Sequence, residues 1–245
     1  MQSVGSRMRS DVGDAIRDCL DRFDVTAAIL FGSFVERTEY RDIDLMVILD
    51  ERGEIGRVGR VSRVGGIGQI WEELCAIDAR IDPTFVTTAI FEENLSLGNP
   101  FYLNVLGGEP IIGSGYLEQC RENAGTPSRE IIRRYLDHSV HFYERAKVSL
   151  EYFDCYAACK FLIEHLMLKR GAYVTDPHRY DSYLAESGLP LDAGSRDVIS
   201  RILMHRRGDA ELCEGDVENA IRIVEKMIEW IASGSRMKDR STQLL

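Results

Sequence analysis

Small and acidic residues gather in one short stretch of the chain, at the ends of two apolar segments. Gly32 and Ser33 follow the apolar run 25–31, and after eight further residues Asp42 and Asp44 open a second apolar run. On a strand, aspartates two residues apart share one face at a spacing of roughly 6.5 Å. Like charges so placed repel each other unless cations lie between them. The spacing therefore predicts a site for two Mg²⁺ ions, with Mn²⁺ as a substitute.

The Gly-Ser pair is suited to hold phosphate. The run 25–31 has the length and β-branched content of a buried strand. A helix that starts after it would present unpaired backbone N–H groups to an anion. Gly32 allows a ligand to approach the backbone closely, and the Ser33 hydroxyl can donate to a phosphate oxygen. Beside two metal ions, this pair predicts a site where a hydroxyl attacks a triphosphate and pyrophosphate departs.

A third carboxylate is expected on a neighbouring strand, because two side chains cannot both fill the metal shell and orient the nucleophile. Asp82 meets this need within the strand-like segment 80–86, and Asp50 and Asp78 are the alternatives. Pro83 lacks a backbone donor, which predicts an edge or bulged strand. We predict as catalytic residues and metal ligands Asp42, Asp44 and Asp82, and as nucleotide-binding residues Gly32 and Ser33.

At these residues the chain resembles the nucleotidyltransferase superfamily related to DNA polymerase β, in its minimal form of Gly-Ser, spacer, Asp-x-Asp and a later single Asp. The resemblance covers about residues 10–118. It implies that Asp42 and Asp44 hold both metal ions and that Asp82 helps to activate an acceptor hydroxyl. It also implies that Gly32 and Ser33 hold the phosphates of a nucleotide.

The first half of the chain is expected to form a small mixed sheet packed by helices, in an α/β (α+β) arrangement. Ser10 is placed to cap the first helix. The predicted helices cover residues 10–23, 67–77, 89–97 and 100–106, and the predicted strands cover residues 25–31, 42–49, 80–86 and 109–112.

Only helical periodicity follows the polar gap at 122–127, which is therefore the best domain boundary. Thr126 or Ser128 would cap a helix to about residue 151, and Asp154 would cap the next. Further helices are expected near 178–187, 195–207 and 216–233. We predict a nucleotidyltransferase domain at 1–122, an all-α helical bundle at 126–235 and a disordered tail at 236–245.

The second half resembles the HEPN (higher-eukaryote and prokaryote nucleotide-binding) bundles and the helical half of aminoglycoside nucleotidyltransferases. The resemblance rests on architecture and on the segment 159–165, and it implies acceptor binding or pairing of two copies of the chain. HEPN ribonucleases carry an Arg and a His about four to six residues apart. The candidate pairs are Arg201 with His205 and Arg133 with His138.

Composition excludes several classes of protein. The net charge of −10 argues against nonspecific binding of nucleic acid, which needs a basic surface. The six cysteines show no ligand spacing and suit a reducing cytoplasm, and no apolar run approaches the ~18–20 residues that span a bilayer. The loop arginines Arg57, Arg60 and Arg63 either contact a triphosphate or acidic acceptor or are simply solvated.

Three functions stay open at this point. The leading prediction is an enzyme that moves a nucleoside monophosphate, most readily AMP from ATP, to a hydroxyl of a small molecule, protein or RNA end. The second is a catalytically silent nucleotide-binding or antitoxin-like protein that acts through the helical bundle. The third is a HEPN-type ribonuclease. The sequence does not decide the base, the acceptor or the oligomeric state.

Overall fold

The computed structural model describes residues 4–36, 40–50, 66–172, 178–186, 189, 191–206 and 208–233. The chain forms two compact units, residues 1–128 and residues 129–245. The arginines Arg57, Arg60 and Arg63 and the predicted tail at 236–245 lie outside the described residues. Within the described residues, no helix combines the length and apolar character needed to cross a membrane.

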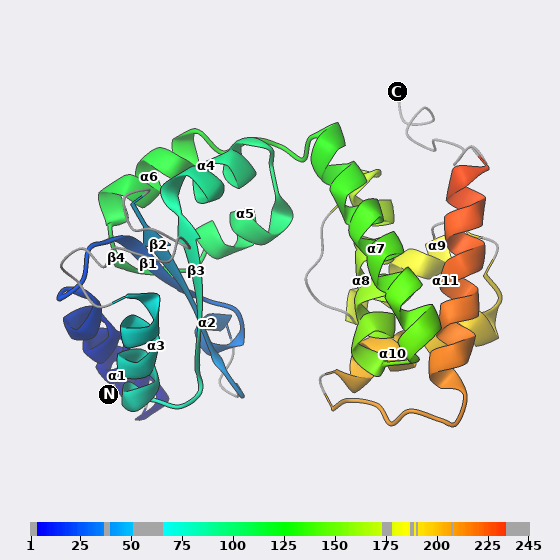
Figure 1. The fold of residues 1–245 in the computed structure, drawn as a ribbon, viewed down its shortest axis with the longest axis horizontal. Helices are drawn as coiled ribbons and strands as arrows, with labels where there is room; N and C mark the ends of the chain where they lie inside the picture. The colour runs from blue at the N-terminus through cyan, green and yellow to red at the C-terminus, as the bar shows by residue number, and fades with distance from the viewer. Residues whose placement is uncertain are drawn as a thin grey trace. The chain divides into compact units, whose positions relative to one another are not determined.

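A mixed sheet lies at the centre of the first unit (Figure 1). Its strands stand in the order β3-β2-β1-β4, with β1 antiparallel to both of its neighbours and β2 parallel to β3. This is the predicted mixed-sheet class, followed by a helical second half. The strands are β1 Val25–Phe31, β2 Ile43–Leu49, β3 Ile81–Thr87 and β4 Glu109–Ile112.

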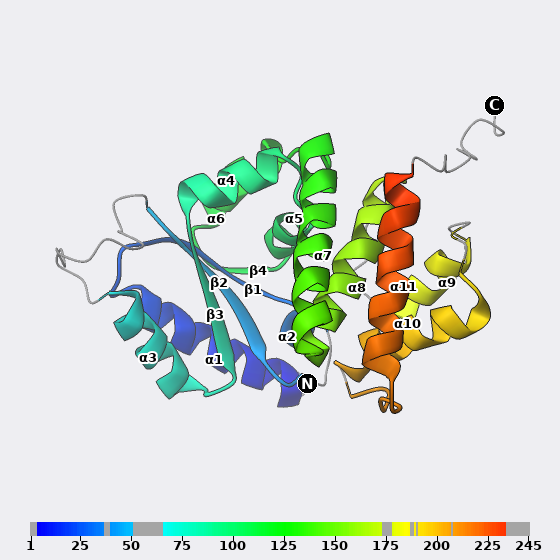
Figure 2. The same cartoon turned by 45° about the vertical axis from the view of Figure 1, so that its right-hand side comes forward.

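Helices cover both faces of the sheet (Figures 1 and 2). On β2, Leu45 and Val47 pack toward one helical layer and Met46 and Ile48 toward the other, all with no measurable exposure. The sheet is thus held between two apolar cores. The first layer contains α1 Val4–Leu20 and α3 Ile67–Ile77, and the second contains α4 Thr88–Ser96, α5 Pro100–Leu106 and α6 Ser114–Glu122.

Strand β3 lies at the edge of the sheet, as Pro83 predicts. Pro83 stands opposite Leu45 of β2 in the parallel register. An edge strand needs only one row of its backbone groups for pairing, so it tolerates a residue without an N–H donor. The prediction of an edge position for the strand of Asp82 is confirmed.

Three local predictions differ from the structure. Helix α1 begins at Val4, so Ser10 lies inside it instead of capping it. Helix α6 was not predicted at all. The N-cap of α8 is Glu151, and Asp154 lies within the first turn of the helix. Asp154 is buried there, where it pairs with Arg145 at 3.1 Å and accepts a hydrogen bond from Ser149.

The second unit is a helical bundle built around α8 (Figure 2). This helix is buried on nearly every side, as expected of a helix that is apolar all round, and α7, α10 and α11 pack on it. The helices are α7 Arg129–Ser149, α8 Tyr152–Leu168, α9 His178–Glu186, α10 Ala193–His205 and α11 Asp216–Ala232.

An ion pair ties α10 to the start of α11. Arg201 donates two hydrogen bonds to the buried Asp216 carboxylate, at 2.9 and 2.8 Å, and the Cys213 backbone N–H donates a third at 2.8 Å. The hydrogen bonds from Arg201 are the main cause that holds the pKa of Asp216 below its ordinary value. A carboxylate buried with this many donors is stable only while the donors stay in place.

Arg201→Met should lower the free energy of unfolding by about 3 kcal/mol at pH 7, because it leaves the Asp216 charge buried without its partner. The pKa of Asp216 is lowered in the folded state, so the pair stabilises the protein above pH ~4 and the effect fades as the pH falls below that value. Urea unfolding at pH 7 and pH 3 measures both. Arg222→Met, at an exposed site on α11, is the control; equal losses in the two variants would contradict this account.

Candidate functional site

The predicted carboxylates meet where β2 and β3 begin. Asp44 and Asp82 are direct partners in the parallel register of the two strands. Partners on neighbouring strands lie about 4.8 Å apart and direct their side chains to the same face. Asp42 stands just before β2, two residues from Asp44, and its negative charge acts on Asp44 together with that of Asp82. Residues nearly 40 positions apart in the sequence thus form one acidic cluster.

The cluster lies at the border between core and solvent. Asp44 shares its face of β2 with Met46, which is buried beneath the second helical layer, whereas Asp42 and Asp82 are exposed. Asp44 itself is half-buried. The cluster is therefore supported by the core on one side and open to a ligand on the other.

The electrostatics of Asp44 reflect this position. Burial, followed by the negative charges of Asp42 and Asp82, raises its pKa to about 6. Among the described residues, no lysine or arginine forms an ion pair with Asp44. The site therefore concentrates negative charge without a cation from the described chain to balance it.

Neither alternative to Asp82 joins the cluster. Asp78 is held by Arg80, which donates two hydrogen bonds to its carboxylate at 3.0 and 2.7 Å and lowers its pKa. Asp50 follows β2 at the end opposite to Asp44. The register therefore favours Asp82 as the third carboxylate.

A tight turn places Gly32 against Asp44. Phe31, the last residue of β1, pairs with Asp44 across the antiparallel register. Gly32 follows in the left-handed region, with φ +68°, and a Cβ atom there would lie 2.3 Å from an Asp44 carboxylate oxygen. Both the conformation and the lack of space require glycine. Ser33 then begins the short helix α2 Ser33–Glu36, so the predicted order of strand, glycine and helix start is found.

A small pocket of about 160 Å³ adjoins the turn. Asn104 of α5 is the polar side chain in its lining, and its carboxamide offers both a donor and an acceptor. Asn104 lies in a short helix without any motif, so the sequence does not predict this contribution; the pair Gly107-Gly108 is the one local signal. The pocket is lined by Phe31, Gly32, Val35, Leu103, Asn104, Gly107 and Gly108.

The donor set suits a hard divalent cation. Carboxylate oxygens are the ligands that Mg²⁺ prefers, and a cation would relieve the repulsion that raises the pKa of Asp44. Within the described part of the chain, no three acidic, histidine or cysteine side chains already enclose a metal position. The three carboxylates fit Mg²⁺ chemically, and they would have to turn toward each other to hold it.

The ribonuclease candidates in the second unit have structural partners. Arg201 is held by Asp216, and His205 lies 2.9 Å through Nδ1 from the Ala210 carbonyl oxygen, with its ring edge on Tyr152. On α7, Arg133 pairs with Asp137 at 3.4 Å and His138 packs on Phe161. Each of these four residues thus has a contact within the second unit.

Comparison with solved structures finds similar chains. The chain is similar to the crystal structure of a nucleotidyltransferase-like protein from Exiguobacterium sibiricum 255-15, at 15% sequence identity and a TM-score of 0.33. The alignment covers 93% of this chain and 77% of that chain. No protein-family model and no curated protein matches the sequence. A TM-score of 0.33 is too low to assign a fold or a function. The proposed function therefore rests on the geometry of the site.

Gly32→Ala should destabilise the first unit by at least about 2 kcal/mol and displace the Asp44 side chain, because the new methyl group meets the carboxylate in a strained backbone conformation. The matched control is Gly68→Ala in α3, where no atom lies within 4 Å of the added carbon. The control should be neutral or stabilising by up to ~1 kcal/mol. Thermal unfolding measures both, and equal behaviour of the two variants would refute the close contact.

Asp44→Asn should raise the Tm by about 2–4 °C at pH 8 in EDTA, since it removes a charge that the fold accommodates poorly. The folded pKa of about 6 lies above the ordinary value, so ionisation of Asp44 costs stability as the pH rises through 6, and no cost exists below pH ~4. The gain should therefore vanish at pH 4. Asp24→Asn, at an exposed position before β1, should show no such pH dependence.

Proposed function

We propose that the first unit transfers a nucleoside monophosphate from a nucleoside triphosphate, ATP in the first instance, to a hydroxyl acceptor with release of pyrophosphate. The observation that carries this proposal is the meeting of Asp42, Asp44 and Asp82 beside the glycine turn at the end of β1. Basic side chains could neutralise an acidic cluster without a metal ion. Among the described residues, Asp44 forms no ion pair with such a side chain, which supports a site for cations.

Each residue has a role that its position supports. Asp42 and Asp44 are proposed to bind Mg²⁺, or Mn²⁺ in its place, together with Asp82. When bound, such cations neutralise the triphosphate oxygens and the developing charge of the reaction. Gly32 leaves its backbone open to the phosphates, and Ser33 can donate a hydrogen bond to them. The pocket at Asn104 adjoins this turn and offers room for part of the nucleoside.

The bond changes of the proposed reaction balance. The acceptor oxygen bonds to the α-phosphorus while the bond from that phosphorus to the bridging oxygen of pyrophosphate breaks. The proton of the acceptor hydroxyl passes to the Asp82 carboxylate, which is exposed on the edge strand and so can be approached by an acceptor. The chain thus supplies the base, and pyrophosphate carries away the electron pair of the broken bond.

Several finer statements stay predictions. They are the preference for ATP, the pairing of two copies through the bundle, and a cytoplasmic location. A catalytically silent nucleotide-binding or antitoxin-like protein would use the same phosphate and metal site without turnover. The ribonuclease alternative is not proposed, since the contacts of Arg201 and His205 explain these residues as parts of the bundle.

Asp42→Asn and Asp44→Asn should each lower transfer of label from α-labelled ATP, and release of pyrophosphate, by about 100-fold or more, because each removes charge that holds the metal ions. Asp24→Asn removes the same charge at an exposed site outside the cluster and should retain activity. Thermal unfolding confirms that all three variants are folded.

Activity that survives both substitutions in the cluster would refute the proposal. Stabilisation of the wild-type chain by ATP and Mg²⁺ without turnover, lost in Asp44→Asn, would support the silent nucleotide-binding alternative in its place.

A further inference from the structure

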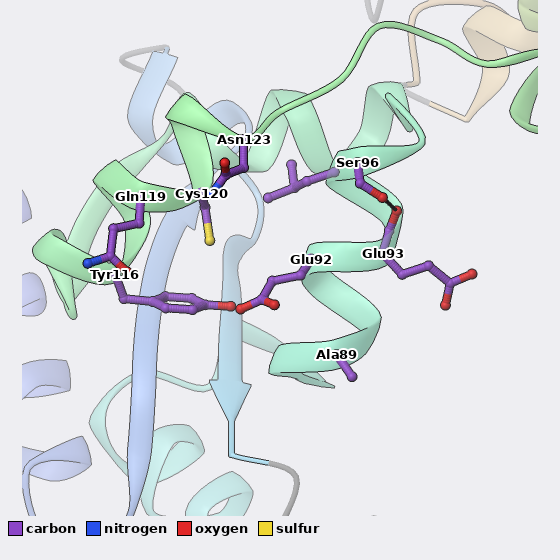
Figure 3. Close-up of a pocket in the computed structure, with 9 residues that line it drawn as sticks. Ala89, Glu92, Glu93, Ser96, Tyr116, Gln119, Cys120 and Asn123 are labelled. Carbon is purple, nitrogen blue, oxygen red and sulfur yellow. Dashed lines mark hydrogen bonds between the residues drawn. The ribbon is translucent and has the colours of Figure 1, made fainter.

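A second pocket, of about 430 Å³, lies between α4 and α6 (Figure 3). Each helix contributes one face, since the lining positions on both recur at intervals of three and four residues. None of them belongs to the acidic cluster or to the glycine turn, so this is a separate site. It is lined by Ala89, Glu92, Glu93, Leu95 and Ser96 of α4 and by Tyr116, Gln119, Cys120 and Asn123 at α6.

The ionisable groups in this lining are all acids. Burial is the main cause that raises the pKa values of Tyr116 and Cys120, and the nearby charge of Glu92 raises both further. The phenol and the thiol are therefore neutral at pH 7, and the carboxylates of the lining are those of Glu92 and Glu93. No lysine, arginine or histidine is among the lining residues. The pocket repels anions and attracts cations.

One polar atom in the pocket is poorly satisfied. The Tyr116 side chain extends toward Glu92 (Figure 3), and its interactions with Cys120 and Glu92 add to the burial that raises its pKa, although its hydroxyl makes no hydrogen bond of ordinary geometry within the described residues. A buried hydroxyl is stabilised when a well-placed acceptor takes its hydrogen. A ligand that orders the Glu92 carboxylate would let this carboxylate accept a hydrogen bond from Tyr116.

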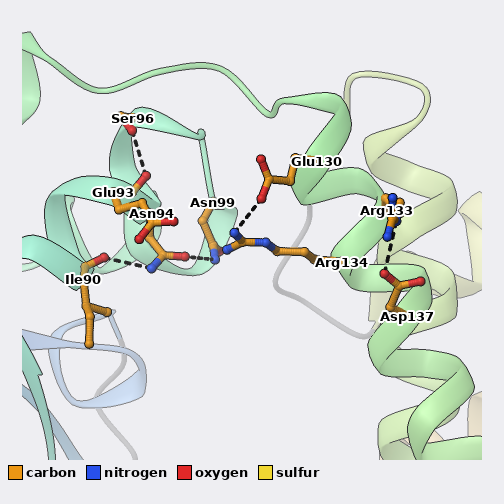
Figure 4. Close-up of polar contacts among 9 residues, drawn as sticks. All are labelled: Ile90, Glu93, Asn94, Ser96, Asn99, Glu130, Arg133, Arg134 and Asp137. Carbon is orange, nitrogen blue, oxygen red and sulfur yellow. Dashed lines mark hydrogen bonds and ion pairs between the residues drawn. The ribbon is translucent and has the colours of Figure 1, made fainter.

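One wall of the pocket, α4, is held in place by hydrogen bonds at both of its ends. Thr87 caps the start of α4 by accepting from the Ile90 N–H at 3.3 Å. At the other end, Asn94 donates to the Ile90 carbonyl oxygen at 2.8 Å and accepts from Asn99 at 2.9 Å (Figure 4). Ser96 donates to the Glu93 carbonyl oxygen at 2.8 Å. The wall that carries Glu92 is therefore ordered before a ligand binds, which lowers the entropic cost of binding.

We propose that this pocket binds a small organic cation that carries ammonium groups, of the aliphatic polyamine class. Ammonium N–H groups can donate to the Glu92 carboxylate and to the side-chain oxygens of Gln119 and Asn123, while Ala89 and Leu95 face the methylene groups. A metal ion is a poorer fit, because Glu92 extends toward Tyr116 whereas Glu93 extends away from it (Figure 3), so the two carboxylates do not converge on one point. The proposal does not depend on nucleotidyl transfer.

Titration calorimetry of the full chain with spermidine tests the site. Glu92→Gln should weaken binding about tenfold, the loss expected for one charge-assisted hydrogen bond. Ala89→Trp, which leaves the charge unchanged and fills an exposed part of the lining, should weaken it at least as much. The matched control is Glu118→Gln, which removes the same charge from an exposed position of α6 outside the lining and should change the affinity less than about twofold.

Two results would overturn the proposal. One is the absence of heat from wild-type protein at spermidine concentrations up to about 1 mM. The other is equal weakening by Glu92→Gln and Glu118→Gln without an effect of Ala89→Trp, which would mean that spermidine binds to the diffuse charge of an acidic chain. Because none of these variants touches Asp42, Asp44 or Asp82, failure of this proposal leaves the proposed transfer activity untested by it and separately measurable.

Discussion

Repulsion among three carboxylates is the constraint around which the first unit is built. The parallel pairing of β2 and β3 sets Asp44 opposite Asp82, and the turn before β2 adds Asp42. Burial, followed by the charges of Asp42 and Asp82, raises the pKa of Asp44 to about 6, so the folded state carries an electrostatic cost at neutral pH. Apolar residues on both faces of the sheet must offset that cost. Neutral residues at these positions would be more stable. The presence of three carboxylates therefore indicates a functional site.

The register of β2 protects this arrangement. Leu45, Val47, Met46 and Ile48 are all fully buried in two different cores, so a slip of one residue would exchange the two faces and drive Asp44 into the wrong layer. The glycine turn adds a second restraint, since it fits against the Asp44 carboxylate with no room for a side chain. Core packing and turn chemistry thus fix the same carboxylate from two directions.

Features that depend on neighbouring residues in the sequence were predictable. The first strand begins and ends where its apolar run does, at Val25 and Phe31, and Pro83 indicates an edge strand.

Features that depend on residues distant in the sequence could not be predicted. The sequence predicts Asp154 as a helix cap, because its ion pair with Arg145 from another helix leaves no local signal. Helix α6 has a weak local signal, and its inner face at Leu117 becomes explicable only against the completed sheet. The pocket at Asn104 arises for the same reason, from a helix and a strand end that no motif connects.

The charge of the ligand separates the two proposed sites of the first unit. A triphosphate is repelled by bare carboxylates, and it can approach Asp44 only with cations and with the backbone donors beyond Gly32. The pocket between α4 and α6 offers an anion neither of these, since its donors are side-chain amides and hydroxyls beside two carboxylates. An ammonium compound, in contrast, needs no metal ion to enter it. One acidic chain can therefore bind an anion and a cation at different places, because only the first place combines carboxylates with an open glycine turn.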